Sequence, residues 1–122
     1  MKFDELKPGM LVKDEGLLRD IVINGKSSKG EPISIFGGKN AISFFDINDP
    51  YYGSCSRAVK DNTNFEILHE IGSIEYKKVL LELAQERAKN VEDALKDIKL
   101  ILEYVGGKTD EKLDEGNKGD NN

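Results

Sequence analysis

A heptad repeat of apolar residues runs without interruption through the second half of this 122-residue chain. Such a repeat keeps one narrow stripe of a helix facing a partner helix over its whole length. The sequence therefore predicts a helix that takes part in assembly. Its members follow one another at alternating spacings of three and four residues: Leu81, Ala84, Ala88, Val91, Leu95, Ile98, Leu102 and Val105.

The repeat predicts one long helix over residues 74–105. Ser73 suits the N-cap position before this segment, and Gly106 with Gly107 is typical of a helix end. A helix of this length would extend roughly 48 Å, which is more than the width of a small domain. We expect the helix to be unbroken or gently bent. The alternative is a break at Asn90, because the acidic residues that follow it are typical of a second helix start.

A second apolar stripe widens the same face of the predicted helix and consists of Leu80, Leu83, Ala94 and Ile101. Two stripes suit a helix that contacts its own β unit and a second chain at once. The alternative is an amphipathic helix that packs entirely on its own sheet. The first stripe is the expected homodimer or oligomer interface: Leu81, Ala84, Ala88, Val91, Leu95, Ile98 and Leu102.

The residues before the helix alternate between short apolar runs and turn signals. We expect Asn24-Gly25 to open a loop and residues 48–63 to be irregular. The expected strands, spaced about ten residues apart, cover residues 11–13, 17–23, 33–36, 41–47 and 64–71. This pattern predicts an α+β fold with a small antiparallel sheet or SH3-like barrel. The expected organisation is a β unit at 1–72, an amphipathic assembly helix at 73–105 and a disordered tail at 106–122.

Composition excludes several classes of protein. The net charge of −5 is spread evenly, and no segment has the basic excess of a protein that follows a phosphate backbone. Cys55 and His69 are the single cysteine and the single histidine, so we expect no internal disulfide, no zinc site and no cofactor. No apolar run has the length of a signal peptide or a membrane span. These observations predict a cytoplasmic protein without a polymeric nucleic-acid partner or a membrane partner, and they leave a small anionic ligand open.

No motif in the chain predicts an enzyme. Residues 46–49 begin like a calcium loop, but Pro50 occupies a ligand position. The glycines at 25 and 30 have phosphate-loop spacing, but Glu31 stands where the lysine is required. Cys55 has no base near it in the sequence that would activate it as a nucleophile.

The irregular stretch after residue 48 contains the best ligand-binding candidate. Tyr51 and Tyr52 offer aromatic faces for stacking on a base, and Gly53 lets backbone amides approach a phosphate. Arg57 is suited to bidentate phosphate contact. Arg57→Ala is therefore expected to abolish ligand binding and to leave the fold intact. The alternative is a solvated loop without a ligand. Further candidates for polar contacts with the ligand are Arg19, Asn48, Lys60 and Asn62.

The chain begins with a short β unit that opens with Glu5-Leu6-Lys7-Pro8-Gly9-Met10 and carries Gly53 and Arg57 in a polar loop. A helical segment follows. In these features the chain resembles the first Thoeris anti-defence family of phage proteins. The resemblance implies an oligomer in the host cytoplasm, with a pocket near the dimer interface. It implies that the pocket binds a cyclic ADP-ribose isomer made by host TIR-domain enzymes and does not cleave it. Some members of that family also trap cyclic oligonucleotides.

The residues leave a second interpretation open, which is a non-enzymatic adaptor for protein interaction. In this interpretation the β unit is a barrel-like head and the helix is a dimerisation arm. A nucleotide would raise the melting temperature of a sequestering protein and would have no effect on an adaptor.

Overall fold

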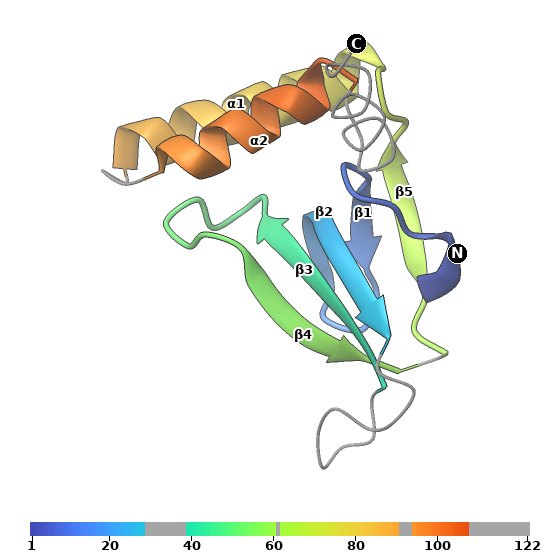
Figure 1. The fold of residues 1–122 in the computed structure, drawn as a ribbon. Coiled ribbons are helices and arrows are strands. Elements are labelled where there is room, and N and C mark those ends of the chain that lie inside the picture. The colour runs from blue at the N-terminus through green and yellow to red at the C-terminus, as the bar shows by residue number, and fades with distance from the viewer. Residues whose placement is uncertain (29–38, 61, 91–93, 108–122) are drawn as a thin grey trace, which may run out of the picture.

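A computed structural model describes residues 1–28, 39–60, 62–90 and 94–107 of the chain. The fold is α+β, with a five-stranded antiparallel sheet followed by two helices (Figure 1). A 3₁₀ helix, Phe3–Glu5, precedes the first strand. The strands are β1 (Leu11–Asp14), β2 (Arg19–Ser28), β3 (Asn40–Asp46), β4 (Cys55–Val59) and β5 (Phe65–His69), and the helices are α1 (Ile74–Asn90) and α2 (Leu95–Val105).

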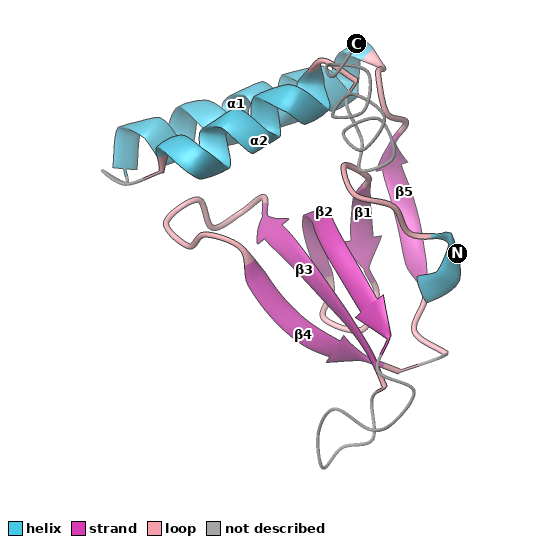
Figure 2. Ribbon diagram, viewed as in Figure 1, coloured by secondary structure: helices cyan, strands magenta, loops and turns pink. Residues whose placement is uncertain are grey.

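The sheet is open and does not close into a barrel. The strand order is β4-β3-β2-β1-β5, and every neighbouring pair is antiparallel. The two edge strands, β4 and β5, make no ladder with each other in the described residues, and they lie on opposite sides of the sheet in Figure 2. The predicted α+β class is confirmed, whereas the SH3-like barrel is not formed.

Three of the predicted strands, at 11–13, 41–47 and 64–71, match β1, β3 and β5. Other details of the β unit differ from the prediction. The expected loop at Asn24-Gly25 is wrong, because β2 continues through both residues with a bulge between Ile23 and Gly25. The expected irregular stretch contains β4, which pairs with β3 at the sheet edge. The predicted strand at 33–36 lies outside the described residues.

The expected unbroken helix is wrong and the alternative, a break at Asn90, is confirmed, because α1 ends at Asn90 and α2 begins at Leu95. The two helices lie side by side as a hairpin along one end of the sheet (Figure 1). Because the chain turns back after α1, apolar side chains of both helices can pack on the sheet. One straight helix of this length would leave part of them in water. Buried members of the second stripe are Leu80, Leu83, Ala94 and Ile101. Of the predicted tail, the described residues include only Gly106 and Gly107.

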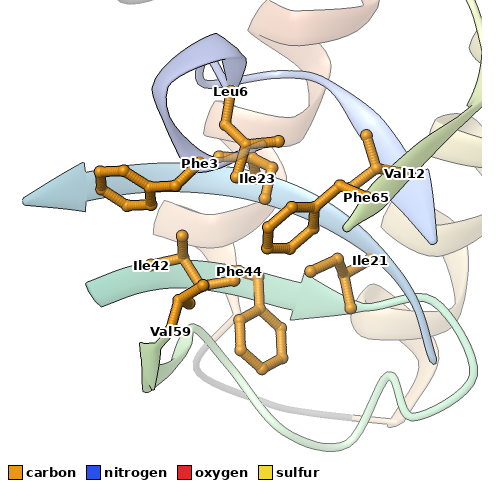
Figure 3. Close-up of a cluster of buried hydrophobic side chains, with 9 residues drawn as sticks. All are labelled: Phe3, Leu6, Val12, Ile21, Ile23, Ile42, Phe44, Val59 and Phe65. Atoms are coloured by element: carbon orange, nitrogen blue, oxygen red, sulfur yellow. The ribbon is translucent and has the colours of Figure 1, made fainter. Parts of the chain in front are cut away.

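Apolar side chains fill both faces of the sheet. Successive strand residues point to opposite faces, so Phe44 lies in one core and Phe45 in the other. This explains why the central strands are apolar at consecutive positions, as strands covered on both sides are. Figure 3 shows the first core, where Phe3 and Leu6 of the N-terminal segment meet the strand side chains.

The second core joins the sheet to the helical hairpin. Leu11, Val22 and Phe45 form a row across β1, β2 and β3, because Leu11 pairs with Val22 and Val22 pairs with Phe45. The helices cover this row with Tyr76, Leu80, Leu83, Ala84, Ile101 and Tyr104. The hairpin is therefore an integral part of the folded unit rather than a separate arm.

A buried tyrosine connects α1 to the turn before β1. The Tyr76 hydroxyl donates a hydrogen bond of 2.5 Å to the Gly9 carbonyl. Gly9 has a φ of +94°, and a β-carbon there would lie 3.3 Å from the Tyr104 ring. Burial raises the pKa of the Tyr76 phenol above its ordinary value of 10, and the neighbouring Tyr104 adds to the shift.

Tyr76→Phe is expected to lower the free energy of unfolding by about 1–3 kcal/mol, because the buried Gly9 carbonyl loses its donor. In the protein that keeps Tyr76, the phenol of the unfolded chain ionises as the pH rises above 10, whereas the phenol of the folded chain ionises only at a higher pH. The folded chain then holds more protons, so stability falls with rising pH. Urea denaturation at pH 8 and at pH 11 measures both effects. Tyr76→Phe removes this contribution to the pH slope, whereas the exposed control Tyr51→Phe keeps it; an unchanged slope in Tyr76→Phe would contradict the assignment.

Candidate functional site

Each of the three arginines of the chain is bound to an aspartate. Arg57, on β4, holds Asp14 of β1 with two contacts, at 2.8 Å from Nε to Oδ2 and 2.9 Å from Nη2 to Oδ1. The Asp14 side chain is fully buried, and its Oδ1 also accepts the Gly16 amide at 2.9 Å. The guanidinium that the sequence predicts to bind phosphate is therefore occupied by a carboxylate of the same sheet.

Arg19 forms a second ion pair, with the buried Asp46 at the end of β3. The Asp46 carboxylate raises the pKa of Arg19 through its hydrogen bond and its charge. Asp46 Oδ1 also accepts the Asn48 backbone amide at 2.9 Å, which fixes the start of the loop after β3. Two predicted ligand residues, Arg19 and Asn48, thus meet at one carboxylate.

The third pair, between Arg87 and Asp97, joins the two helices to the loop between β3 and β4. Arg87 is buried at 3% exposure, and its Nη2 lies 2.6 Å from Asp97 Oδ2. Its Nη1 donates to the Pro50 carbonyl at 2.6 Å. The Arg87 Nε is, among the residues the structure describes, the buried side-chain nitrogen that lacks a hydrogen-bond partner. Arg87 follows Leu80 and Leu83 on the buried side of α1, and an arginine on an apolar stripe is the signal that could have revealed this residue.

The predicted aromatic loop covers this third pair. A β-carbon added at Gly53 would lie 3.1 Å from Asp97 Oδ2 and 3.6 Å from Arg87 Nη2, so the loop packs closely on the pair. Tyr51 and Tyr52, by contrast, are each 64% exposed. The loop therefore has a glycine turned toward the helices and two tyrosine rings in contact with solvent.

A cleft of about 480 Å³ lies between the sheet and α2, beside the same loop. We call it the α2 cleft. The Asn24 side-chain amide donates to the Ser54 hydroxyl at 3.0 Å, and the Tyr104 hydroxyl donates to Asn24 Oδ1 at 3.1 Å. The cleft has two lysines and two acids, one of which is paired with Arg87. Its lining residues are Asn24, Ser54, Lys96, Asp97, Lys99, Leu100 and Glu103.

The structure does not bring the predicted ligand residues into one site. Gly53 lies against Asp97, which lines the α2 cleft. Lys60 and Asn62 follow β4 on the way to β5, and the Asn62 carbonyl accepts a hydrogen bond from Lys2 Nζ at 3.1 Å. The lysines of α2 and Asn24 were not among the predicted ligand residues, because only the hairpin turn brings α2 next to the β3–β4 loop.

The predicted interface residues divide between the core and the surface. Ala84 is buried, and Ile98 packs against the core that contains it. Four residues of the repeat, each seven positions after the one before, face solvent together with Ile74. We call these five residues the apolar strip: Ile74, Leu81, Ala88, Leu95 and Leu102. Val91 lies outside the described residues.

Two features are absent from the described residues. These residues contain no group of three or more histidine, cysteine, aspartate or glutamate side chains placed to hold a metal ion. None of their helices has the length and hydropathy needed to cross a membrane. Compared with known proteins, the chain matches no family model, no curated protein and no solved structure.

Proposed function

We propose that this protein is a non-catalytic binding protein that sequesters a small anionic nucleotide in the α2 cleft. The observation that carries the proposal is the cleft itself. Its volume of about 480 Å³ falls within the range of roughly 300–1,000 Å³ that is typical of small-molecule sites. It combines ammonium groups, hydrogen-bonding side chains and an apolar side chain, which is the mixture that a phosphorylated ring compound requires.

Each lining group has a defined role in the proposal. Lys96 and Lys99 supply positive charge for phosphate, since an ammonium group binds phosphate as a point charge. Ser54 and Asn24 supply hydrogen bonds to a sugar or base, and Leu100 supplies apolar contact. The charge of Asp97 is balanced by Arg87, so this carboxylate opposes an anion less than an unpaired one would.

The resemblance to the first Thoeris anti-defence family supplies the class of ligand. It implies a cyclic ADP-ribose isomer, or a cyclic oligonucleotide, that is held and not cleaved. The location of the proposed site differs from the sequence-based prediction, because Arg57 is bound to Asp14 and the lysines of α2 take its place. The loop with Ser54 also exposes the rings of Tyr51 and Tyr52.

Thermal denaturation in the presence of cyclic ADP-ribose isomers and cyclic oligonucleotides tests the proposal. A ligand at 100 times its Kd stabilises the folded state by about 2.7 kcal/mol, which is a readily measured rise in Tm. The double variant Lys96→Glu, Lys99→Glu is expected to lose this rise. Lys89→Glu, an exposed α1 lysine outside the cleft lining, is the matched control and should keep it. No rise with any of these compounds at millimolar concentration would refute the proposal.

The apolar strip favours a second candidate function, which is protein interaction. Large exposed aliphatic side chains on one face of a helical hairpin are typical of an interaction surface. An interaction module would show no response to nucleotides and would depend on the strip rather than on the lysines of the cleft.

A further inference from the structure

The apolar strip places large aliphatic side chains in water. Ile74 is 81% exposed, Leu95 63%, Leu102 44% and Leu81 40%. On α1 the strip residues follow one another at intervals of seven, and seven residues rotate by only about 20° relative to a straight line along the helix. Ile74, Leu81 and Ala88 therefore form one line on one side of α1.

The strip residues of α2 continue the same surface. The Arg87–Asp97 pair fixes the register of the two antiparallel helices, so Leu95 lies near the level of Ala88 and Leu102 near the level of Leu81. The seam between the helices is filled from the core side, where Ile98 and Val105 pack on the cluster that contains Ala84. The two lines of the strip thus flank this seam on the outer side of the hairpin.

We infer that a second copy of this chain covers the apolar strip, with the two α1 helices packed antiparallel about a two-fold axis at Leu81. In this arrangement Leu81 meets Leu81 of the second copy. Ile74 lies level with Ala88 of the second copy, and Ala88 lies level with Ile74, since both are seven residues from the axis. The most exposed large side chain of the line therefore meets the smallest one, and this contact occurs twice in each dimer.

The charges beside this line favour the same antiparallel arrangement. Exposed Lys78 precedes Leu81 and exposed Glu82 follows it, and at 100° per residue both lie on the same side of the line. A two-fold axis at Leu81 sets Lys78 level with position 84 of the second copy, about 3 Å along the axis from Glu82 of that copy. A parallel pair in register would instead place lysines on lysines and glutamates on glutamates. Complementary charges of this kind select the orientation of two helices.

The apolar strip is separate from the proposed ligand site. None of the five strip residues lines the α2 cleft. The inference therefore goes beyond the proposed function, and either one can fail while the other holds. Oligomeric mass tests the strip, and the nucleotide-dependent rise in Tm tests the cleft.

Light scattering after size-exclusion chromatography of the full chain is expected to give twice the chain mass of 13.6 kDa. Leu81→Lys places two ammonium groups against each other at the axis and should give a monomer with unchanged helical circular dichroism. Leu18→Lys is the matched control, because Leu18 is an exposed leucine outside the strip and its substitution should leave the dimer intact. A monomeric native chain overturns the inference, even if a different protein binds the strip. A dimer that persists in Leu81→Lys also overturns it.

Oxidative cross-linking tests the orientation of the two helices. In a Cys55→Ser background, Leu81→Cys is expected to form a disulfide between copies, because the two positions meet at the axis. Ala88→Cys is expected to form none, since the two copies of position 88 are about 21 Å apart along the helices, beyond the roughly 7 Å that a disulfide spans. Cross-linking at both positions would indicate a parallel pair and overturn the inference. A dimer that cross-links at neither position would place the axis elsewhere and would also overturn it.

Discussion

Arg57→Ala is expected to destabilise the folded protein by about 3–5 kcal/mol, because it leaves the Asp14 carboxylate without its counter-ion inside the sheet. Asp14 is fully buried, and both of its oxygens are bound by the guanidinium. Urea denaturation of the variant would show a large fall in the midpoint. The structure thus changes the outcome expected from sequence alone, which is loss of ligand binding with an intact fold.

Arg19→Ala is the matched control for this experiment. It also removes an arginine from a buried aspartate, but the Arg19 side chain is 53% exposed and solvent screens the pair. We expect a much smaller loss of stability. The double variant Arg57→Met, Asp14→Leu should recover a large part of the loss, since apolar residues of similar volume replace a buried pair well. An Arg57→Ala protein as stable as the native chain would contradict the role assigned to this pair.

Asp97→Ala is expected to cost more stability than Arg87→Met, although the two substitutions break the same ion pair. Arg87 is 3% exposed, whereas Asp97 is 25% exposed. Removal of Asp97 leaves a buried guanidinium whose Nε already lacks a partner, at a cost of about 3–5 kcal/mol. Arg87→Met removes the buried charge, keeps most of the volume and leaves a carboxylate that water reaches.

Urea midpoints of the two variants, measured side by side, test this asymmetry. Equal midpoints, or a lower midpoint for Arg87→Met, would show that the Pro50 carbonyl contact matters more than the unpaired charge. Glu103→Ala is a suitable control, because it removes another carboxylate from the cleft lining without breaking the helix–helix pair. The ligand experiment should use variants that keep Arg87, since this residue fixes the loop with Ser54 beside the cleft.

The strands that could be predicted from the sequence are those with a local signal. Leu11-Val12 and the apolar run of β3 stand between turn residues, and a short strand forms wherever such a run can be buried. The strand β4 could not be predicted because its sequence, Cys-Ser-Arg-Ala-Val, has no clear apolar alternation, although turn residues stand on both sides of it. It is a strand because β3 offers an edge with which it can pair, and that edge is a tertiary feature.

The repeat on the helices could be recognised from the sequence, but the hairpin could not be distinguished from a straight helix. An amphipathic pattern fixes which side chains are buried and leaves the number of helices open. The candidate site was harder still. Arg57 meets Asp14, and Arg87 meets Pro50, across long stretches of chain. An arginine that binds phosphate and an arginine that binds a buried aspartate have the same local sequence, so only the fold separates the two roles.

The strand order has a consequence for how quickly this chain folds. β1, β2 and β3 are each paired with the next strand along the chain, so these three ladders form from nearby segments. The remaining ladder joins β1 to β5, where Asp14 pairs with Phe65 after β2, β3 and β4 have intervened. Closing a long stretch of chain costs entropy before its contacts repay it. We therefore expect the pairing of β5 with the free edge of β1 to be the slowest of the four strand pairings.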